Sequence, residues 1–372
     1  MDSIGVYIHI PFCVRKCRYC DFPSFGGKND IDSYFKALFS EIHNEGETEG
    51  RTADSVYIGG GTPSLVPPFF IRELMDILRK KYVIGENAEI SMEMNPGTID
   101  SEALKVYFEA GINRVSLGCQ SFNDRSLMRL GRIHSSADAI KTYDMLRKQG
   151  FNNINLDLMS GLPGEEAGDM ERSLYKALEL GPEHLSVYSL IIEPGTEFHR
   201  MYEEGELEDL PSEEELEETD RMIRSILEKN GYMRYEISNY ARSGRECVHN
   251  IRYWTRGEYR GYGLSAASLI GNRRFTNTRD LVYINQPGAA LQEDRILSRE
   301  EEMQEFMFLG LRMVSGVSSR DFRDCFGEDI GKIYGKQLED QIKNGFMEYD
   351  GERYRYNDRG LDVSNRLMSE FL

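Results

Sequence analysis

Short apolar runs alternate with longer amphipathic stretches from the N-terminus to about residue 190. The apolar runs predict strands at residues 6–10, 55–58, 89–93, 114–119, 153–158 and 184–189. The amphipathic stretches between them predict helices over residues 32–43, 68–81, 101–110, 137–149 and 169–180. Such alternation is typical of βαβ units around a parallel sheet. Six repeats are too few to close the usual eight-stranded barrel, so we expect an α/β fold with an incomplete (β/α)6 barrel.

Beyond residue 190 the pattern becomes mainly helical. Ser212 is followed three residues later by Glu215, which is a capping-box signature and predicts a helix over residues 212–229. The composition then turns rich in Tyr, Arg and Gly before helical periodicity returns. We expect a partial barrel over residues 1–232, a connecting segment over 233–285 and a smaller, mainly helical C-terminal domain over 286–372. The last should contain helices at 298–314 and 330–344 and a hairpin of 346–349 with 353–356.

Composition and charge narrow the class of protein. Hydrophobic residues make up 40% of the chain, which excludes a disordered protein, and the net charge of -18 repels phosphate backbones, so nucleic acid is not an expected partner. No apolar run reaches about 18 residues, and no signal-type leader precedes the first strand, so no transmembrane segment is expected. We therefore expect a cytoplasmic protein whose six cysteines are thiols or metal ligands rather than disulfides.

Polar residues cluster at the ends of successive predicted strands. The first strand leads into a group of cysteines, and the second into the run Gly59 to Pro63. Glu93 ends the third strand, Gln120 follows the fourth and Asp157 lies on the fifth. Because ligands bind at the carboxyl ends of strands in parallel α/β folds, all five elements should face one common site.

Cys13, Cys17 and Cys20 crowd into one short loop with a C-x3-C-x2-C spacing. Three thiolates at this spacing can hold three corners of an iron–sulfur cube. The fourth iron then keeps an open position, which is the mark of a metal site that binds a substrate or cofactor. A structural zinc, or three unrelated buried thiols, is the alternative, but no further cysteines lie nearby in the sequence to complete a zinc tetrahedron.

Residues 7–20 read Tyr-Ile-His-Ile-Pro-Phe-Cys-Val-Arg-Lys-Cys-Arg-Tyr-Cys. This segment resembles the opening motif of the radical S-adenosylmethionine (SAM) superfamily, in its oxygen-independent coproporphyrinogen III oxidase-like branch, and the resemblance covers essentially the whole chain. It implies a radical SAM partial TIM barrel with a 4Fe-4S cluster on Cys13, Cys17 and Cys20. It also implies that SAM chelates the open iron and is cleaved to a 5′-deoxyadenosyl radical by an electron from the cluster.

The same resemblance implies a set of contacts to SAM or to a second cofactor molecule. The cofactor-binding residues expected from it are Tyr7, Tyr19, Gly60, Gly61, Thr62, Glu93, Gln120, Arg132 and Asp157. Each alone has a plainer interpretation, since Glu93 and Asp157 could be capping or paired carboxylates and the glycines an ordinary βα turn. Their occurrence at successive strand ends favours the functional interpretation.

Two features separate this chain from the porphyrinogen-oxidising enzymes of the branch. Those enzymes carry a fourth cysteine in a C-x2-C-x-C ending and a longer N-terminal extension, whereas here Phe22 stands at the fourth position and only six residues precede Tyr7. In addition, residues 249–254 read His-Asn-Ile-Arg-Tyr-Trp. This segment resembles the His-Asn-x-x-Tyr-Trp signature of the HemW-type heme chaperones, which implies heme as a ligand and His249 as its binding residue.

The residues around His249 suit heme physically. A neutral imidazole can occupy an axial position on iron. Aromatic faces could come from Tyr253, Trp254, Tyr259 and Tyr262, and propionate partners from Arg252, Arg256 and Arg260. The alternative is that His249 hydrogen-bonds within an interdomain linker while the aromatics pack there.

Other details of this region depart from the signature or have plain interpretations. Where the family commonly carries a second histidine in a Gly-Ala-His, this chain has Ala267. Cys247 could be a soft ligand but is more simply a plain thiol, and we expect Cys119 and Cys325 to be packing residues.

Two hypotheses follow from the sequence. The first is a heme chaperone that binds heme and delivers it to an apo-hemoprotein, on a core that binds a 4Fe-4S cluster and SAM. The second is an enzyme, an oxygen-independent coproporphyrinogen III dehydrogenase or a related heme-modifying radical SAM enzyme. Phe22 and the His249 segment favour the first. A membrane-associated acceptor such as a respiratory cytochrome would require only peripheral contact with the membrane.

Overall fold

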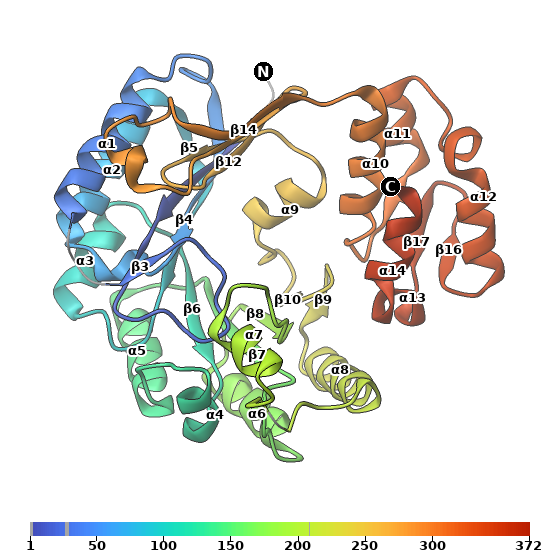
Figure 1. Ribbon diagram of the computed structural model, residues 1–372, viewed down its shortest axis with the longest axis horizontal. Coiled ribbons are helices and arrows are strands. Elements are labelled where there is room, and N and C mark those ends of the chain that lie inside the picture. Colours follow the sequence, from blue (N-terminus) through green and yellow to red (C-terminus); the bar gives the residue numbers. More distant parts are fainter. Residues whose placement is uncertain (1–2, 27–29, 208) are drawn as a thin grey trace.

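The computed structural model describes residues 3–26, 30–207 and 209–372 and confirms the α/β partial barrel (Figure 1). Parallel strands run side by side through its centre in the order β1 (Ile4–Ile10), β4 (Thr52–Gly60), β5 (Val83–Met94), β6 (Arg114–Gln120), β7 (Ile154–Ser160) and β8 (His184–Ser189). All six predicted strands are present. Helices on the outer face are α1 (Ile31–Asn44), α2 (Pro68–Lys81), α3 (Ser101–Glu109), α4 (Asp124–Arg129), α5 (Ser136–Gln149) and α6 (Asp169–Leu180).

The alternation of side chains along each strand separates two environments. On β1, Ile4, Val6 and Ile8 are fully buried in the main hydrophobic core. The residues between them, such as Tyr7, point to the other face, inside the barrel, because successive side chains of a strand alternate. Apolar residues therefore hold the helices on the outside, and polar or small residues line the inside, where a ligand can be bound.

The Tyr, Arg and Gly-rich segment extends both edges of this sheet. On one side lie β11 (Tyr259–Tyr262), β12 (Ala267–Ile270), β13 (Arg273–Asn277) and β14 (Leu291–Ile296), with β11 parallel to β1. On the other side, β10 (Asn239–Ala241) and β9 (Met233–Arg234) follow β8. The sheet thus continues past residue 285, and the domain limits expected at 232 and 285 stay predictions.

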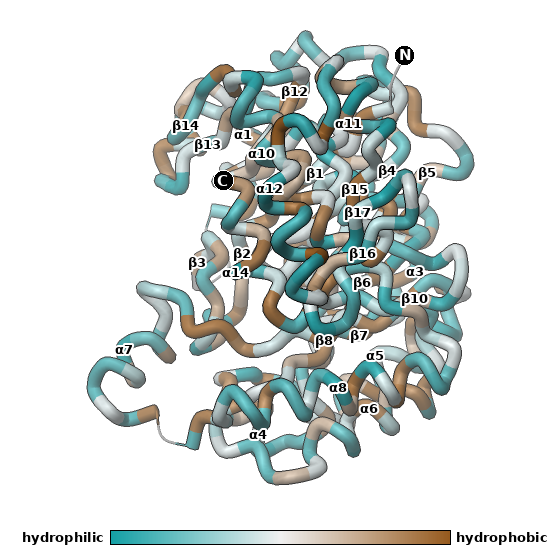
Figure 2. Tube along the Cα trace, turned by 90° about the vertical axis from the view of Figure 1, so that its right-hand side faces the viewer, coloured by the Kyte–Doolittle hydropathy of each residue, from teal (hydrophilic) through white to brown (hydrophobic). Residues whose placement is uncertain are grey.

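The remaining elements connect or cap the barrel. They are β2 (Phe12–Cys13), β3 (Phe25–Gly26), the 3-10 turns Pro63–Leu65 and Leu281–Ile284, α7 (Glu197–Glu203), α8 (Glu213–Lys229) and α9 (Val248–Trp254). The capping box predicted for α8 is present, since Ser212 and Glu215 bond reciprocally. Along the tube in Figure 2, α8 alternates hydrophilic and hydrophobic residues, as an amphipathic helix does.

The C-terminal domain has a hydrophobic core of its own, built around Met307, Phe322 and Leu338. Its elements are α10 (Arg299–Gly310), β15 (Val317–Ser318), α11 (Ser319–Phe326), α12 (Ile330–Lys343), β16 (Met347–Tyr349), β17 (Arg353–Tyr356), α13 (Asp358–Asp362), α14 (Ser364–Met368) and the 3-10 turn Ser369–Phe371. The predicted hairpin is β16 with β17.

The helix expected to reach residue 314 instead ends at Gly310. Beyond it, Met313 forms a β-bridge with Glu236, and the Val314 amide donates to the Tyr235 carbonyl at 3.0 Å. These residues therefore connect the C-terminal domain to the barrel rather than continue the helix.

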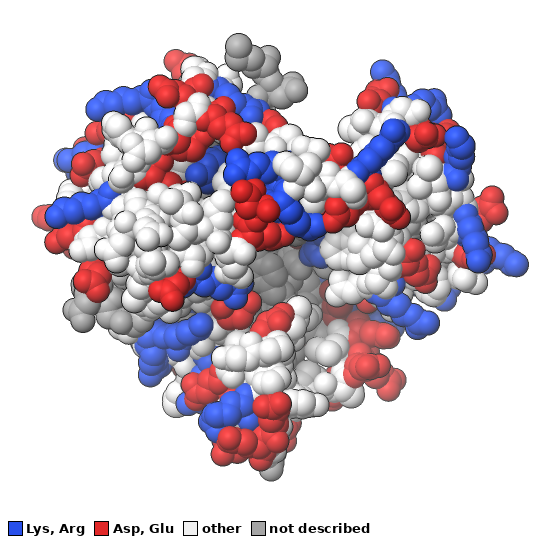
Figure 3. Space-filling view, turned by 45° about the horizontal axis from the view of Figure 1, so that its top comes forward, with Lys and Arg blue, Asp and Glu red and all other residues white. Residues whose placement is uncertain are grey.

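Acidic and basic side chains are interspersed on the face shown in Figure 3. In the described residues, no helix combines the length and apolar character that a bilayer crossing requires.

The Ser212 cap provides a test of the fold. Replacing Ser212 with Ala removes the acceptor of the Glu215 amide, so we expect the free energy of unfolding to fall by about 1 kcal/mol in urea denaturation. Ser101→Ala, which changes an exposed serine one position inside α3, is the matched control because Asp100 caps that helix. Equal unfolding midpoints for the two variants would contradict this role of Ser212.

Candidate functional site

The cysteine loop lies directly against the end of β4. Ile10 pairs with Gly60 in the β1–β4 register. Beyond the paired strands, the Gly61 amide donates to the Ile10 carbonyl and the Thr62 amide to the Phe12 carbonyl, both at 2.8 Å. A Cβ on Gly61 would come within 2.7 Å of the Phe12 carbonyl oxygen, so only glycine permits this approach. The backbone of Gly61 and Thr62 therefore bonds directly to the start of the cysteine loop.

Polar groups surround the three cysteines. Cys13, Cys17 and Cys20 are half-buried free thiols. The Thr62 hydroxyl lies 3.6 Å from the Cys13 sulfur, and a guanidinium N–H of Arg132 donates to the Cys17 sulfur at 3.4 Å. Hydrogen-bond donors therefore face the sulfurs of Cys13 and Cys17, and the donor at Cys17 carries a positive charge.

A second segment holds the loop from the other side. The Arg15 guanidinium donates to the Gly131 carbonyl at 2.6 Å, and the Arg18 amide donates to the Leu130 carbonyl at 3.1 Å. A small hollow of about 20 Å³ lies between the loop and this segment; among its lining residues are Cys17, Thr62, Asn95 and Arg132. In the part of the chain described, no three His, Cys, Asp or Glu side chains stand close enough together to hold a single metal ion.

Glu93 lies at the end of β5, inside the barrel. Its carboxylate accepts hydrogen bonds from the Gly60 amide and from the Tyr57 hydroxyl, both at 3.0 Å. Burial, together with the nearby negative charge of Asp157, raises the pKa of Glu93 to about 7. The carboxylate is thus fixed in position and titrates near neutral pH.

Asp157 faces Glu93 from β7. It accepts from the Ser116 hydroxyl at 3.0 Å and from the Asn155 amide at 2.7 Å, and burial raises its pKa. The positive charge of Arg114 acts on both carboxylates and partly offsets the effect of burial on their pKa values. Both remain able to accept hydrogen bonds from a ligand in the barrel.

Gln120 and Arg132 complete this end of the barrel. Gln120 adopts a positive φ of 65°, which turns the chain sharply after β6. Arg132 donates to the Asn95 side chain at 2.9 Å and also to the Gly118 carbonyl. Tyr19 lies close enough to Arg132 to influence its pKa. The strand ends therefore bring together the cysteine loop, Gly60, Gly61, Thr62, Glu93, Gln120, Arg132, Asp157 and Tyr19.

Tyr7 lies deeper in the barrel and contacts a residue that sequence reasoning missed. Its hydroxyl lies 3.1 Å from Nδ1 of His9, whose Nε2 lies 2.9 Å from the Pro23 carbonyl oxygen. The His9 ring also fills the space beside Gly60, where a Cβ would come within 2.7 Å of it. Asn95 was missed as well, although its amide donates to the Thr62 hydroxyl at 2.8 Å. His9 lies two residues after Tyr7 on the same strand, so both side chains point to the same face, and this spacing could have predicted that His9 faces the site.

His249 lies near the opposite ends of the strands. Helix α9 packs against the start of β4, where the Ser55 hydroxyl lies 3.0 Å from Nδ1 of His249. Nε2 of the same ring lies 2.9 Å from the Tyr253 hydroxyl, and His249 is only 1% exposed. Burial lowers the pKa of His249 to about 3, so the imidazole is neutral. Tyr253 belongs to the connecting segment and Ser55 to the barrel, so the His249 ring bridges the two, and its role in heme binding stays a prediction.

The arginines near His249 are paired with carboxylates, which corrects the expectation of free propionate partners. Arg252 bonds to Asp54, Arg256 to Glu302 at 2.7 Å, and Arg260 to Glu41 at 3.1 Å. The aromatics are also occupied by protein contacts. Tyr262 is fully buried and its hydroxyl donates to Glu45, while Trp254 packs under the Arg312 guanidinium, which lies 4.3 Å from the Trp254 ring centroid.

The other cysteines have plain environments. Cys119 is fully buried in β6, as predicted, and Cys247 is buried with its thiol 3.4 Å from Glu89. Cys325, expected to be a packing residue, is exposed, because α11 turns Phe322 and Phe326 rather than Cys325 toward the core.

Comparison with known proteins places these observations in a family. The Radical SAM superfamily model matches residues 7–175, and the HemN C-terminal domain model matches residues 297–363. The heme chaperone HemW of Bacillus subtilis is 36% identical over 99% of this chain and 99% of its own length. The heme chaperone HemW of Escherichia coli is 34% identical over 100% of this chain and 99% of its own length. The chain belongs to the HemW family.

Among solved structures, the coproporphyrinogen III oxidase HemN of Escherichia coli has a fold similar to that of this chain. The two superimpose with a TM-score of 0.86 and 24% sequence identity, covering 99% of this chain and 90% of that chain. This likeness shows a shared fold. As a member of the radical SAM superfamily, the protein uses a 4Fe-4S cluster and SAM.

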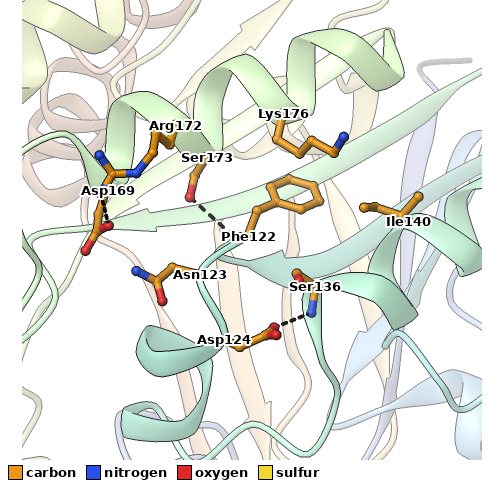
Figure 4. A pocket seen from close by; sticks show the side chains of 9 residues that line it. All are labelled: Phe122, Asn123, Asp124, Ser136, Ile140, Asp169, Arg172, Ser173 and Lys176. Carbon is orange, nitrogen blue, oxygen red and sulfur yellow. Dashed lines mark hydrogen bonds and ion pairs between the residues drawn. The ribbon is translucent and has the colours of Figure 1, made fainter.

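The residues present fit those cofactors. The three free thiols share one loop, two of them next to hydrogen-bond donors, and the glycine run leaves backbone rather than side chains beside the loop. A separate cavity of about 440 Å³ lies between α5 and α6, where Phe122 meets residues of both helices (Figure 4). None of the expected cofactor-binding residues lines it.

The cysteine loop generates a prediction about iron content. Anaerobic reconstitution of this HemW-family protein should give about four irons per chain, and Cys17→Ala should reduce iron to background because the loop loses one of three ligands. Cys325→Ala, which removes an exposed thiol far from the loop, should load normally. Cluster loading of both variants is measured by iron content and visible absorption. A wild-type protein that takes up zinc but resists iron would contradict the cluster assignment.

The raised pKa of Glu93 predicts a pH dependence of stability. Its pKa rises from 4.5 unfolded to about 7 folded, so the folded chain binds the extra proton and stability falls as pH rises through that window. Glu93→Gln should flatten this dependence and stabilise the protein above pH 7 by up to about 3 kcal/mol. The control is Glu109→Gln, which changes an exposed carboxylate on α3. If the free energies of unfolding of Glu93→Gln and wild type changed in parallel between pH 4.5 and about 7, burial would not raise the pKa of Glu93 as described.

Proposed function

We propose that this chain is a heme chaperone, which binds heme and delivers it to an apo-hemoprotein. The observation that carries the proposal is the match of the entire chain, at 36% identity and 99% coverage on both sides, to a protein named heme chaperone HemW. Supporting it, the segment His249 to Trp254 carries the His-Asn-x-x-Tyr-Trp signature in one helix, α9.

In this proposal Cys13, Cys17 and Cys20 bind three irons of the cluster, and the open iron binds SAM. The cluster supplies one-electron chemistry when it is present. Arg132 donates a hydrogen bond to the Cys17 sulfur and is itself oriented by Asn95. Glu93 and Asp157 accept hydrogen bonds from the nucleoside, and Gln120, Tyr7 and Tyr19 complete the contacts expected from the family.

The second candidate function is oxygen-independent coproporphyrinogen III dehydrogenation, favoured by the shared fold with HemN. Against it, Phe22 replaces the fourth cysteine of that branch and is 56% exposed beside the loop. Incubation of the reconstituted protein with SAM, a reductant and coproporphyrinogen III under anaerobic conditions separates the two. The proposal expects no protoporphyrinogen, and its formation would favour the enzyme.

The acceptor and location follow from the same proposal. We infer an apo-hemoprotein as the partner, and a membrane-associated acceptor such as a respiratory cytochrome is the finer inference. A protein that acts from the cytoplasm would reach such an acceptor by peripheral contact with the membrane surface, without an inserted segment.

Heme binding by His249 is tested by hemin titration. Added hemin should give a Soret band that is weakened or shifted in His249→Ala, because the imidazole is proposed as an axial ligand. His43→Ala, which removes an exposed histidine of α1, is the matched control. If His249→Ala bound hemin with the wild-type spectrum and affinity, His249 would not be the ligand.

A further inference from the structure

The neutral ring of His249 has no free lone pair in this conformation. A neutral imidazole has one N–H and one lone pair, and both ring nitrogens lie within hydrogen-bond distance of hydroxyls, from Ser55 and Tyr253. In either tautomer, one hydroxyl therefore donates to the nitrogen that iron would need. His249 is also only 1% exposed, so a macrocycle cannot reach it as the chain stands.

Helix α9 is fastened to the barrel by three sets of contacts. At its start, Glu89 accepts from the amides of Val248 at 3.1 Å and His249 at 3.2 Å. In its middle, Ser55 bonds to His249. Near its end, Arg252 pairs with Asp54, in an ion pair whose side chains are 12% and 36% exposed. We call α9 with these contacts the α9 latch.

Two tyrosines, Tyr57 and Tyr7, connect the latch to the cofactor end of the barrel, and of these two only Tyr57 bonds to Glu93 among the described residues. The His249 ring stacks on the Tyr57 ring, with centroids 5.3 Å apart and planes 26° from parallel. The hydroxyl at the far end of the same tyrosine donates to Glu93 at 3.0 Å. Glu93 is also held tightly from β4, because a Cβ on Gly59 would come within 3.0 Å of its carboxylate. Tyr57 thus contacts both the latch and a proposed SAM-binding carboxylate.

We propose that heme reaches His249 only when the α9 latch leaves β4, and that the closed latch supports Glu93 through Tyr57, so that SAM and heme bind in opposition. This inference rests on the proposed heme-chaperone function. SAM binds best to the closed form, in which His249 packs on Tyr57 and Tyr57 fixes Glu93. Heme binds the open form, and its apparent affinity is reduced by the fraction of chains that are closed. Each ligand then weakens the other by the same factor, as linkage requires.

Loosening the latch from the barrel side should strengthen heme binding. Ser55→Ala removes the contact of Nδ1 from β4 without changing α9, so we expect hemin to bind about two- to tenfold more tightly, the range expected for the loss of one neutral hydrogen bond in the closed form. Asp54→Asn breaks the ion pair with Arg252 and should act in the same direction. Both variants are measured by the Soret band, without the cluster.

The matched control is Ser173→Ala. Ser173 is a buried serine like Ser55, but its hydroxyl accepts from the Phe122 amide at 3.2 Å, on the helix α6 outside the barrel. Hemin affinity in this control should equal that of the wild type. Wild-type or weaker hemin binding in both Ser55→Ala and Asp54→Asn would overturn the latch.

The opposition between ligands is tested on the full chain with its cluster reconstituted and no reductant present, so that SAM is not cleaved. Saturating SAM should weaken hemin binding by a factor between roughly 5 and 150, the usual range of coupling between two sites. Tyr57→Phe keeps the stacked ring but loses the hydrogen bond to Glu93, and should reduce the effect of SAM on hemin binding.

The outcomes separate this inference from the function on which it rests. If the wild type binds no hemin, the proposed function fails and the inference fails with it. If the wild type binds hemin through His249 but SAM leaves the affinity unchanged, the chaperone proposal stands and the opposition is wrong.

Discussion

The parallel pairing of β1 with β4 sets the positions of both the cysteine loop and helix α9. It runs from Ile4 opposite Ala53 to Ile10 opposite Gly60, with a register shift between Ile4 and Gly5. At its carboxyl end the pairing continues as the backbone bonds of Gly61 and Thr62 to the cysteine loop. At its other end it forms the floor on which α9 packs, since a Cβ on Gly5 would come within 3.3 Å of His249. One register therefore positions both the cluster loop and the heme signature.

The inside of the barrel is polar, so its groups must find partners or change their charge. The structure shows buried polar groups that have partners and buried groups whose charge state is shifted. Glu93 and Asp157 keep hydrogen bonds but have raised pKa values, and His249 is neutral with both nitrogens engaged. A network of this kind transmits changes, because loss of one partner leaves another buried group unsatisfied. Tyr57 and Tyr7 both stack on His249. Their hydroxyls reach the cofactor end of the barrel, that of Tyr57 at Glu93 and that of Tyr7 at His9.

Much of the central fold could be predicted from the sequence, because the burial pattern of each βα unit is local. Helix α2 occupies the predicted residues 68–81, since its apolar positions repeat at helical spacing and Tyr82 leaves the helix in an extended conformation. The short edge strands β10 to β13 were not predicted, because Tyr, Arg and Gly-rich segments carry no clear alternation. β11 becomes a strand by pairing with the distant β1, and β12 and β13 continue that edge as antiparallel neighbours.

The site was predictable where its chemistry resides in a motif, and not where it depends on pairing between distant residues. The cysteine spacing and the strand-end carboxylates are local signals. The arginines near His249 looked free in the sequence, yet Arg260 pairs with Glu41, 219 residues away. Likewise, the residues around His249 gave no indication that the Ser55 hydroxyl, 194 residues away, would lie within hydrogen-bond distance of Nδ1 of the His249 ring.

A heme chaperone hands its heme unchanged to an acceptor, so heme transfer distinguishes it from an enzyme that transforms a porphyrin. Heme-loaded protein, separated from free hemin, is mixed with an apo-cytochrome, and the Soret bands of donor and acceptor are followed over time. We expect heme to move to the acceptor faster than it dissociates into an inert heme trap. Transfer no faster than dissociation into the trap would contradict it.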